Sequence, residues 1–220
     1  MWCIPKLTPL FIKRMMDILK LYARKYNRRE PVIGVDEKTV QILSHLRNPL
    51  PLVKEHGIRV DFHYKRNGVA NIFVAVEPKG GRRFTQVTDR KTRVDFLAFL
   101  QSLVKQYPRA IHIHIVLDNF GTHSEKKLRE LAGNDPALDK IVFHFTPVHA
   151  SWLNVAELEI DVLQRQCLKE KRFGCKDDLK IHVQAWDLRR NQLKVKIIWK
   201  FTQQKAKQKF KLDGLQILES

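Results

Sequence analysis

The apolar positions of the chain follow two periods, one typical of amphipathic helices and the other of buried strands. Apolar residues three and four positions apart predict helices that start at Thr8 and Pro9 and continue through Tyr22, and at residues 92–106, 124–132, 154–170 and 177–191. Continuous or alternating apolar runs predict strands at residues 32–35, 58–65, 70–77, 82–88, 111–117 and 141–145.

Two turn sequences connect three of these predicted strands. Arg66-Asn67-Gly68 precedes the strand at 70–77, and Pro78-Lys79-Gly80-Gly81 follows it. Such turns favour an antiparallel meander. The later strands alternate with helices, which is typical of parallel pairing. We therefore expect an α/β fold with a mixed sheet, an antiparallel meander plus parallel strands, and helices on both faces.

Two segments have no clear period. Residues 40–57 contain Pro49 and Pro51, and we expect a loop there with at most one helical turn. Residues 205–211 are rich in lysine and have no period that predicts packing.

Charge narrows the class of partner. The chain of 220 residues has 41 Lys and Arg against 23 Asp and Glu, a formal charge of +18. The first thirty residues carry +6 and residues 161–220 carry +8, whereas residues 31–160 carry only +4 and hold most of the acids. Basic ends around an acid-rich centre are typical of a protein that binds a polyanion through its surface.

Several classes of protein are excluded by what the sequence lacks. No apolar run reaches the eighteen residues of a transmembrane helix, and the first residues do not have the pattern of a secretory signal. The three cysteines form no zinc or disulfide framework and favour a reducing compartment. We expect a cytoplasmic protein with no membrane partner.

Asp36 and Asp118 each follow a strand of the buried type directly. Adjacent strands lie about 4.8 Å apart, so both carboxylates could face one site at the sheet edge. Like charges so close repel unless a proton or cation intervenes, and a pair of Mg²⁺ ions is the usual solution in phosphodiester chemistry. The alternative is that each aspartate only ends a strand and caps the next turn.

Glu157 is a third candidate, on the predicted helix 154–170. Asp161 lies one turn further on the same helix face, while Glu159 lies roughly opposite, so spacing alone does not choose between Glu157 and Asp161. A structural alternative is a capping box, in which Asn154 caps the helix and Glu157 reaches back to its amide.

Three motifs carry a resemblance to a known family. They are Val35-Asp36-Glu37-Lys38, Leu117-Asp118-Asn119-Phe120-Gly121-Thr122-His123, and Thr146-Pro147-Val148-His149-Ala150-Ser151-Trp152-Leu153-Asn154-Val155-Ala156-Glu157. They resemble the three acidic motifs of DDE transposases, most closely those of bacterial insertion sequences of the mariner-related branch, and the similarity covers nearly the whole chain.

The resemblance implies a ribonuclease-H-like fold in which Asp36, Asp118 and Glu157 are the catalytic triad and hold two Mg²⁺ ions, for which Mn²⁺ can substitute. It implies metal-dependent DNA cleavage and strand transfer on double-stranded DNA, at the element ends and the target. The interval from Asp118 to Glu157 is somewhat longer than the commonest spacing in the family, and the loop at residues 133–136 is the expected place of the excess.

Further residues of these motifs and nearby basic positions are secondary candidates. We expect site support from Asn119, His123, His149 and Asn154. We expect DNA contacts from Arg90, Lys91, Arg93 and Trp152. Each has an equally simple interpretation as a cap, a packed loop residue or a solvated charge.

We divide the chain into a basic helical connector (1–30), a catalytic domain (31–195) and a basic tail (196–220). Too few residues precede Asp36 for the helix-turn-helix module usual in this family. We therefore expect the catalytic half of a split reading frame or the remnant of a decayed element, with the recognition half supplied by another chain, a homodimer as a further option, and a nucleoid-associated location. The rival interpretations are a catalytically inactive or regulatory DNA-binding fragment and a structure-specific nuclease, such as a junction resolvase.

Overall fold

A five-stranded mixed sheet forms the centre of the computed structural model, which describes residues 7–50, 59 and 61–212. The strand order is β3-β2-β1-β4-β5. β1 (Val32–His45), β2 (Tyr64–Glu77) and β3 (Arg82–Thr88) are antiparallel neighbours. β4 (Ile113–Leu117) runs parallel to β1, and β5 (Ile141–Phe145) runs parallel to β4. The expected mixed sheet is confirmed.

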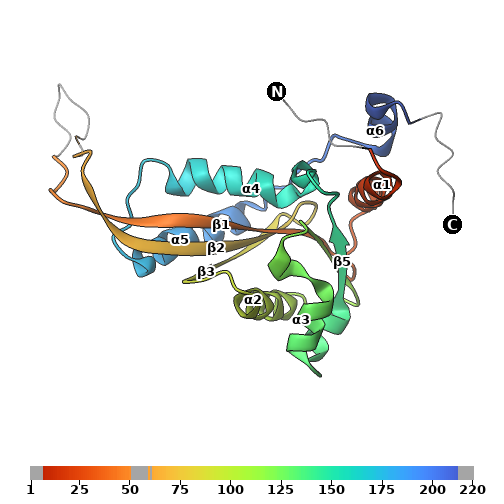
Figure 1. Ribbon diagram of the computed structural model, residues 1–220, viewed down its shortest axis with the longest axis horizontal. Coiled ribbons are helices and arrows are strands. Elements are labelled where there is room, and N and C mark those ends of the chain that lie inside the picture. The colour runs from red at the N-terminus through yellow and green to blue at the C-terminus, as the bar shows by residue number, and fades with distance from the viewer. Residues whose placement is uncertain (1–6, 51–58, 60, 213–220) are drawn as a thin grey trace.

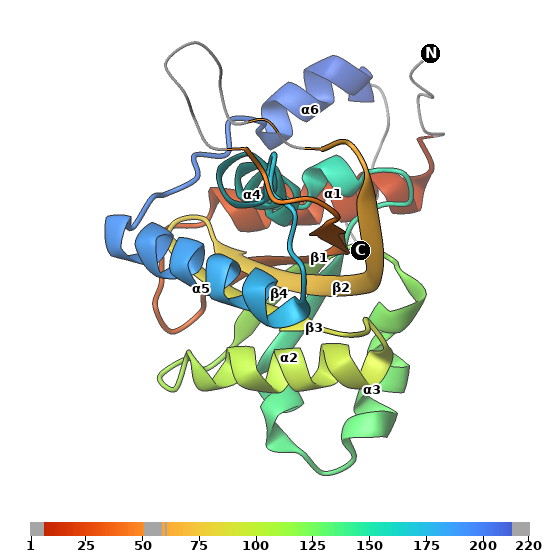
Figure 2. The ribbon, with the colours of Figure 1, turned by 90° about the vertical axis from the view of Figure 1, so that its left-hand side faces the viewer.

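Helices cover both faces of the sheet (Figures 1 and 2). One face is covered by α2 (Arg93–Lys105) and α3 (Glu125–Ala132), whose apolar residues pack against inward-facing residues of β1 and β2. The other face carries α1 (Pro9–Ala23), α4 (Val155–Leu163) and α5 (Lys176–Leu193). Short 3₁₀ turns at Gly121–His123, Pro136–Lys140 and Ser151–Leu153 connect these elements.

The alternation of side chains along the strands explains the two layers. Phe73 and Ala75 of β2 face α2, while Ile72 and Val74, which alternate with them, face α4 and α5. The second half of β2, from Ala70 to Glu77, is therefore buried on both faces, which agrees with its nearly continuous apolar run in the sequence.

Local caps explain where the first two helices begin. The Thr8 hydroxyl accepts a hydrogen bond from the Phe11 amide at 3.1 Å, and Pro9 occupies the first turn, as predicted. Thr92 and Asp95 form a reciprocal capping box at the start of α2.

The antiparallel part of the sheet differs from the prediction. β1 continues through Asp36 to His45, so the loop expected from residue 40 is wrong for residues 40–45, and residues 51–57 of that loop lie outside the described part. β2 is one strand through Arg66-Asn67-Gly68, so the predicted turn there is wrong. Gly68 has φ 116° beside a register shift between Ile42 and Leu43, so the Asn-Gly pair forms a bulge rather than a turn. Of the strand predicted at 58–65, only Tyr64 and the next residue belong to β2, and residues 58 and 60 are not described.

The carboxyl-terminal part is more ordered than its composition suggested. α6 (Gln203–Phe210) is a helix against α1, with Ala206 fully buried and the Gln203 amide donating to the Met16 carbonyl at 3.0 Å. The predicted helix 154–170 is α4 followed by a π-helical turn, Gln164–Leu168. Among the described residues, no helix is long and apolar enough to span a membrane.

Candidate functional site

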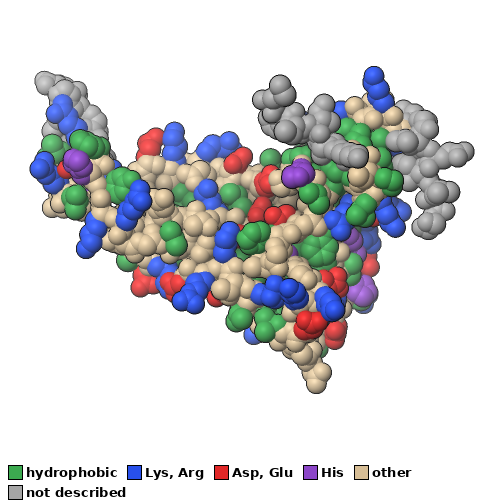
Figure 3. Space-filling view, in the orientation of Figure 1, with side chains coloured by type: hydrophobic (Ala, Val, Ile, Leu, Met, Phe, Trp, Pro, Cys, Tyr) green, Lys and Arg blue, Asp and Glu red, His purple; other side chains and the backbone are tan. Residues whose placement is uncertain are grey.

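Asp36, Asp118 and Glu157 come from three separate elements that meet near one end of the parallel strands. Asp36 lies within β1, Asp118 follows β4 directly, and Glu157 is in the first turn of α4. β1 and β4 are in register with Gly34 opposite Val116, so Asp36 and Asp118 lie at corresponding places on neighbouring strands. Acidic side chains gather on this side of the molecule beside the start of α4 (Figure 3).

Gly34 allows α4 to approach β1 closely. A Cβ atom at this position would lie 2.5 Å from Val155 Cγ1 and 2.9 Å from the Ala156 amide nitrogen. Both distances are shorter than van der Waals contact, so a larger residue would push the helix start away. The glycine therefore brings Glu157 to the same side as Asp36.

Asn154 attaches the start of α4 to β1. Its side-chain oxygen accepts from the Ala156 amide at 3.1 Å, and its side-chain nitrogen donates to the Val35 carbonyl at 2.8 Å and to Asp36 Oδ2 at 3.5 Å. The Asn154 amide donates to the Ser151 carbonyl at 2.6 Å rather than to Glu157. The capping role of Asn154 is confirmed, whereas the reciprocal part for Glu157 is not formed, and the Glu157 carboxylate remains available for the site.

The environment of Asp36 is unfavourable for its charge. Burial, together with the negative charges of Glu37, Asp118 and Glu157, raises the pKa of Asp36 to about 7. The Glu37 amide, which donates to Asp36 Oδ1 at 2.8 Å, offsets only part of this. The charges of three neighbouring acids therefore disfavour ionisation of the half-buried Asp36 carboxylate, which forms no ion pair with a Lys, Arg or His of the described residues.

Asp118 has a partner in His123. The His123 ring donates from Nδ1 to Asp118 Oδ1 at 2.7 Å, and the Phe120 amide donates to the same oxygen at 3.0 Å. Burial favours a higher pKa for Asp118, but the bond to His123 and the charges of His123 and Lys91 bring its pKa below the ordinary value. Asp118 is thus held ionised in a fixed orientation.

Glu37 was not among the predicted site residues, and the structure brings it into the cluster. Its Oε2 lies 3.3 Å from His123 Nε2, and Lys91 Nζ lies 3.5 Å from its Oε1. Burial would lower the pKa of His123, yet its contacts with Asp118 and Glu37 raise that pKa to about 9. A signal was available, because Glu37 directly follows Asp36 in the first motif.

Two of the predicted supporting residues, Asn119 and His149, have different surroundings in the structure. Asn119 accepts from Arg14 of α1 at 2.8 Å and donates to the Thr146 carbonyl, so it connects the loop after β4 to α1 and β5. His149 is exposed with φ 61° and forms no hydrogen bond or ion pair within the described part of the chain.

Two of the four predicted DNA-contacting residues contact the loop that follows β4. Lys91 lies over the Phe120 ring at 4.9 Å, and Arg93 donates to the Gly121 carbonyl at 2.9 Å. Arg90 is exposed, and Trp152, 39% exposed, packs edge-on against Phe201. Lys91 and Arg93 therefore support the loop after β4, while contact with DNA stays a prediction for all four residues.

A hollow of about 440 Å³ lies between β1 and α4. Its lining includes Asp36, Glu37, Glu157 and Asp161. Carboxylate oxygens are the ligands that Mg²⁺ and Mn²⁺ prefer, so the donor set fits a hard divalent cation. Within the described residues, however, no three His, Cys, Asp or Glu side chains converge closely enough to form a complete metal site.

This arrangement of sheet, helices and paired acids defines a class, the ribonuclease-H-like domains, and the expected fold is confirmed by comparison with solved structures. The chain belongs to the DDE superfamily endonuclease family, whose model matches residues 31–180. No curated protein sequence matches the chain.

The similar solved structures include transposase complexes. The Mos1 mariner paired end complex with Mn has a TM-score of 0.57 at 14% identity, covering 89% of this chain and 60% of that chain. The Mos1 transposase paired-end complex with left transposon end has a TM-score of 0.56 at 13% identity, covering 89% and 62%. The corresponding complex with Mg has a TM-score of 0.52 at 15% identity, covering 85% and 57%. The chain therefore spans about 60% of the length of these transposase chains.

Proposed function

We propose that this chain is the catalytic domain of a DDE transposase, which cleaves DNA and transfers strands with Asp36, Asp118 and Glu157 as its metal-holding residues. The element would be a bacterial insertion sequence related to mariner. The observation that carries the proposal is the acid cluster around Asp36, which lies beside the start of α4 within the matched DDE superfamily endonuclease domain.

The side chains of the cluster have distinct parts in this proposal. Asn154 orients Asp36, and His123 orients Asp118 and keeps it ionised. Glu157 supplies the third carboxylate from α4. Divalent cations held by such acids lower the pKa of an attacking water or 3′-hydroxyl and stabilise the leaving oxygen of an in-line displacement. A cation would also relieve the repulsion that now raises the pKa of Asp36.

Double-stranded DNA is the proposed substrate. The formal charge of +18 favours a polyanion, and electrostatic contacts of this kind give affinity with little sequence preference. We propose that sequence recognition at the element ends comes from a helix-turn-helix segment outside this chain. A homodimer would bring two ends together.

A nicking assay tests the proposal. The purified chain should convert supercoiled plasmid to the nicked form with Mg²⁺ or Mn²⁺ and not in EDTA. Asp36→Asn, Asp118→Asn and Glu157→Gln should each reduce the rate at least about a hundredfold, since each removes a charge that the cation requires. Asp161→Asn is the matched control, because Asp161 lines the same hollow on the same helix and should keep the activity. Unchanged nicking in the three acid variants, or equal loss in the control, would refute the assignment.

One observation favours a second candidate, a regulatory fragment that binds DNA without cleaving it. His123 and Lys91 already neutralise Asp118 and Glu37, and the described acids do not converge on one cation position. Such a fragment would bind DNA in a salt-dependent manner and show no affinity for divalent metal, so a metal titration separates the two candidates.

A further inference from the structure

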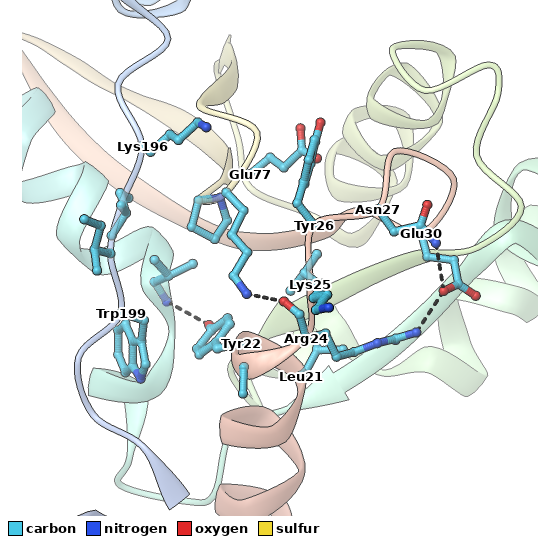
Figure 4. Close-up of a pocket in the computed structure, with 17 residues that line it drawn as sticks. Leu21, Tyr22, Arg24, Lys25, Tyr26, Asn27, Glu30, Glu77, Lys196 and Trp199 are labelled. Carbon is cyan, nitrogen blue, oxygen red and sulfur yellow. Dashed lines mark hydrogen bonds and ion pairs between the residues drawn. The ribbon is translucent and has the colours of Figure 1, made fainter.

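A cavity lined by described residues lies away from the acid cluster, between the carboxyl end of α1, the turn after β2 and the segment that precedes α6. Its volume is about 920 Å³, within the range of pockets that take small ligands. Figure 4 shows that Tyr22 of α1, Glu77 at the end of β2 and the segment with Trp199 surround it. Nothing in the catalytic proposal uses this cavity.

Aromatic and aliphatic side chains form its walls. The Tyr22 and Trp199 rings lie 5.0 Å apart, and the Tyr22 hydroxyl is fixed by the Leu153 carbonyl and the Val155 amide. The backbone bond from the Ile197 amide to the Pro78 carbonyl, 2.9 Å long, holds the Trp199 segment in place. Tyr26 lines the mouth with 46% of its surface exposed. The cavity therefore presents aromatic rings that hydrogen bonds hold in place.

Positive charge surrounds this aromatic cavity without equal negative charge. Arg24 is paired with Glu30 at 2.8 Å, but Lys25, Lys79 and Lys196 form no ion pair with any carboxylate of the described residues. Lys79 donates to the Arg24 carbonyl, which leaves its charge uncompensated (Figure 4). Glu77 is the remaining acid of the lining, and it is buried. A ligand that fits must have a flat apolar body and a negative charge.

We propose that this cavity takes one nucleotide of a single-stranded DNA segment, with its base against Tyr26 and Trp199 and its phosphate against Lys25 and Lys196. Base stacking on aromatic residues combined with cationic contacts to phosphate is the general mode by which proteins hold single strands. The inference rests on the proposed function, because that function identifies DNA as the nucleic acid that the chain binds.

The position of the cavity fits a strand that also reaches the acid cluster. Val32 lines the cavity and Asp36 lies four residues further along β1, a separation of about 13 Å. On α4, Val155 lines the cavity and Glu157 lines the acidic hollow. An unpaired end held in the cavity would thus anchor DNA close to the place of cleavage.

The test is binding of a labelled single-stranded 12-mer in EDTA, where no cleavage interferes. Lys25→Ala/Lys196→Ala should weaken binding about tenfold and reduce the salt slope by about 1.4. The control Lys126→Ala/Lys127→Ala removes the same charge from the exposed face of α3 and should change the affinity less than about twofold. Tyr26→Ala should weaken binding about tenfold, and Tyr26→Phe should restore it.

A second readout reports on the cavity directly. The nucleotide dAMP should quench tryptophan fluorescence, and Trp199→Phe should remove that quenching; inorganic phosphate should not quench. The 12-mer should bind at least about ten times more tightly than dAMP, because neighbouring phosphates add contacts. Equal losses in the pocket and control variants, equal quenching by phosphate, or equal affinity for dAMP and the 12-mer would overturn the inference. Asp118→Asn should keep this binding, so failure of nicking and failure of the pocket are distinguishable.

Discussion

Glu157 and Glu159 lie two residues apart on α4 and face opposite environments. Glu159 is fully buried, and the guanidinium groups of Arg83 and Arg190 contact both of its oxygens at 3.0–3.3 Å. Glu157 faces the hollow beside Asp36, where acids adjoin one another. The difference shows two uses of carboxylates within one helix.

The buried network connects three elements. Arg83 belongs to β3 and Arg190 to α5, so Glu159 ties α4 to both. Asn191 extends the network by exchanging hydrogen bonds with the backbone of Arg83. Removing Glu159 would leave two buried cations without a carboxylate, whereas for the acids around Asp36 we propose a cation from solution. The following predictions test this distinction.

Glu159→Ala should have the largest effect on stability. Removing the carboxylate leaves two guanidinium groups buried without a partner, and we expect the free energy of unfolding to fall by about 3–5 kcal/mol. Urea denaturation measures this value. Glu157→Ala is the matched change on the same helix and should lower it by less than about 1 kcal/mol. Similar losses in both variants would remove the distinction between the two glutamates.

Asp36→Asn should raise the free energy of unfolding, whereas Glu159→Ala should lower it. The substitution removes a charge that burial and the charges of Glu37, Asp118 and Glu157 disfavour, and the one remaining side-chain oxygen can accept from the Glu37 amide. We expect the free energy of unfolding at pH 8 in EDTA to rise by about 2 kcal/mol, less than the full pKa shift implies because the site remains open to solvent. Asp161→Asn should leave it unchanged. A loss of stability in Asp36→Asn would mean that the acid cluster is a structural network like that of Glu159.

His144 offers a smaller test, because it is a basic group that pairs with no carboxylate of the described residues. Burial, together with the nearby His114 and Arg24, lowers the pKa of His144 to about 4. Its ordinary pKa is near 6.5, so the unfolded chain takes up the proton first and stability falls as the pH drops from about 6.5 towards 4.

Between pH 7 and 5 this histidine should lower the free energy of unfolding by about 1 kcal/mol. Denaturation at the two pH values should show that loss in the unmodified chain and in His149→Asn, an exposed control, but not in His144→Asn. An equal pH dependence in all three proteins would contradict the assignment of the loss to His144.

The sequence predicted the features that depend on local pattern. The alternation of strands and helices predicted the sheet and its covered faces, and the caps at Thr8 and Asn154 were readable because they act over a few residues. The three acidic motifs led to Asp36, Asp118 and Glu157, which the structure brings to the same end of the sheet, although their catalytic role is a proposal.

Features that depend on distant partners were not predictable. Arg83 and Arg190 lie 76 and 31 residues from Glu159, and no local pattern marks them as its partners. The Asn67-Gly68 pair is compatible with a turn or a bulge, and only pairing with the long β1 decides for the bulge. Glu37 entered the cluster because His123 and Lys91 reach it from other segments.

The most direct test of the central claim is a calorimetric titration of the chain with Mn²⁺. If Asp36, Asp118 and Glu157 form a divalent-cation site, the unmodified chain and Asp161→Asn should bind up to two Mn²⁺ ions, while Asp36→Asn and Asp118→Asn should lose this binding although they remain folded. Absence of binding in the unmodified chain, or binding that survives in Asp36→Asn and Asp118→Asn, would contradict the account.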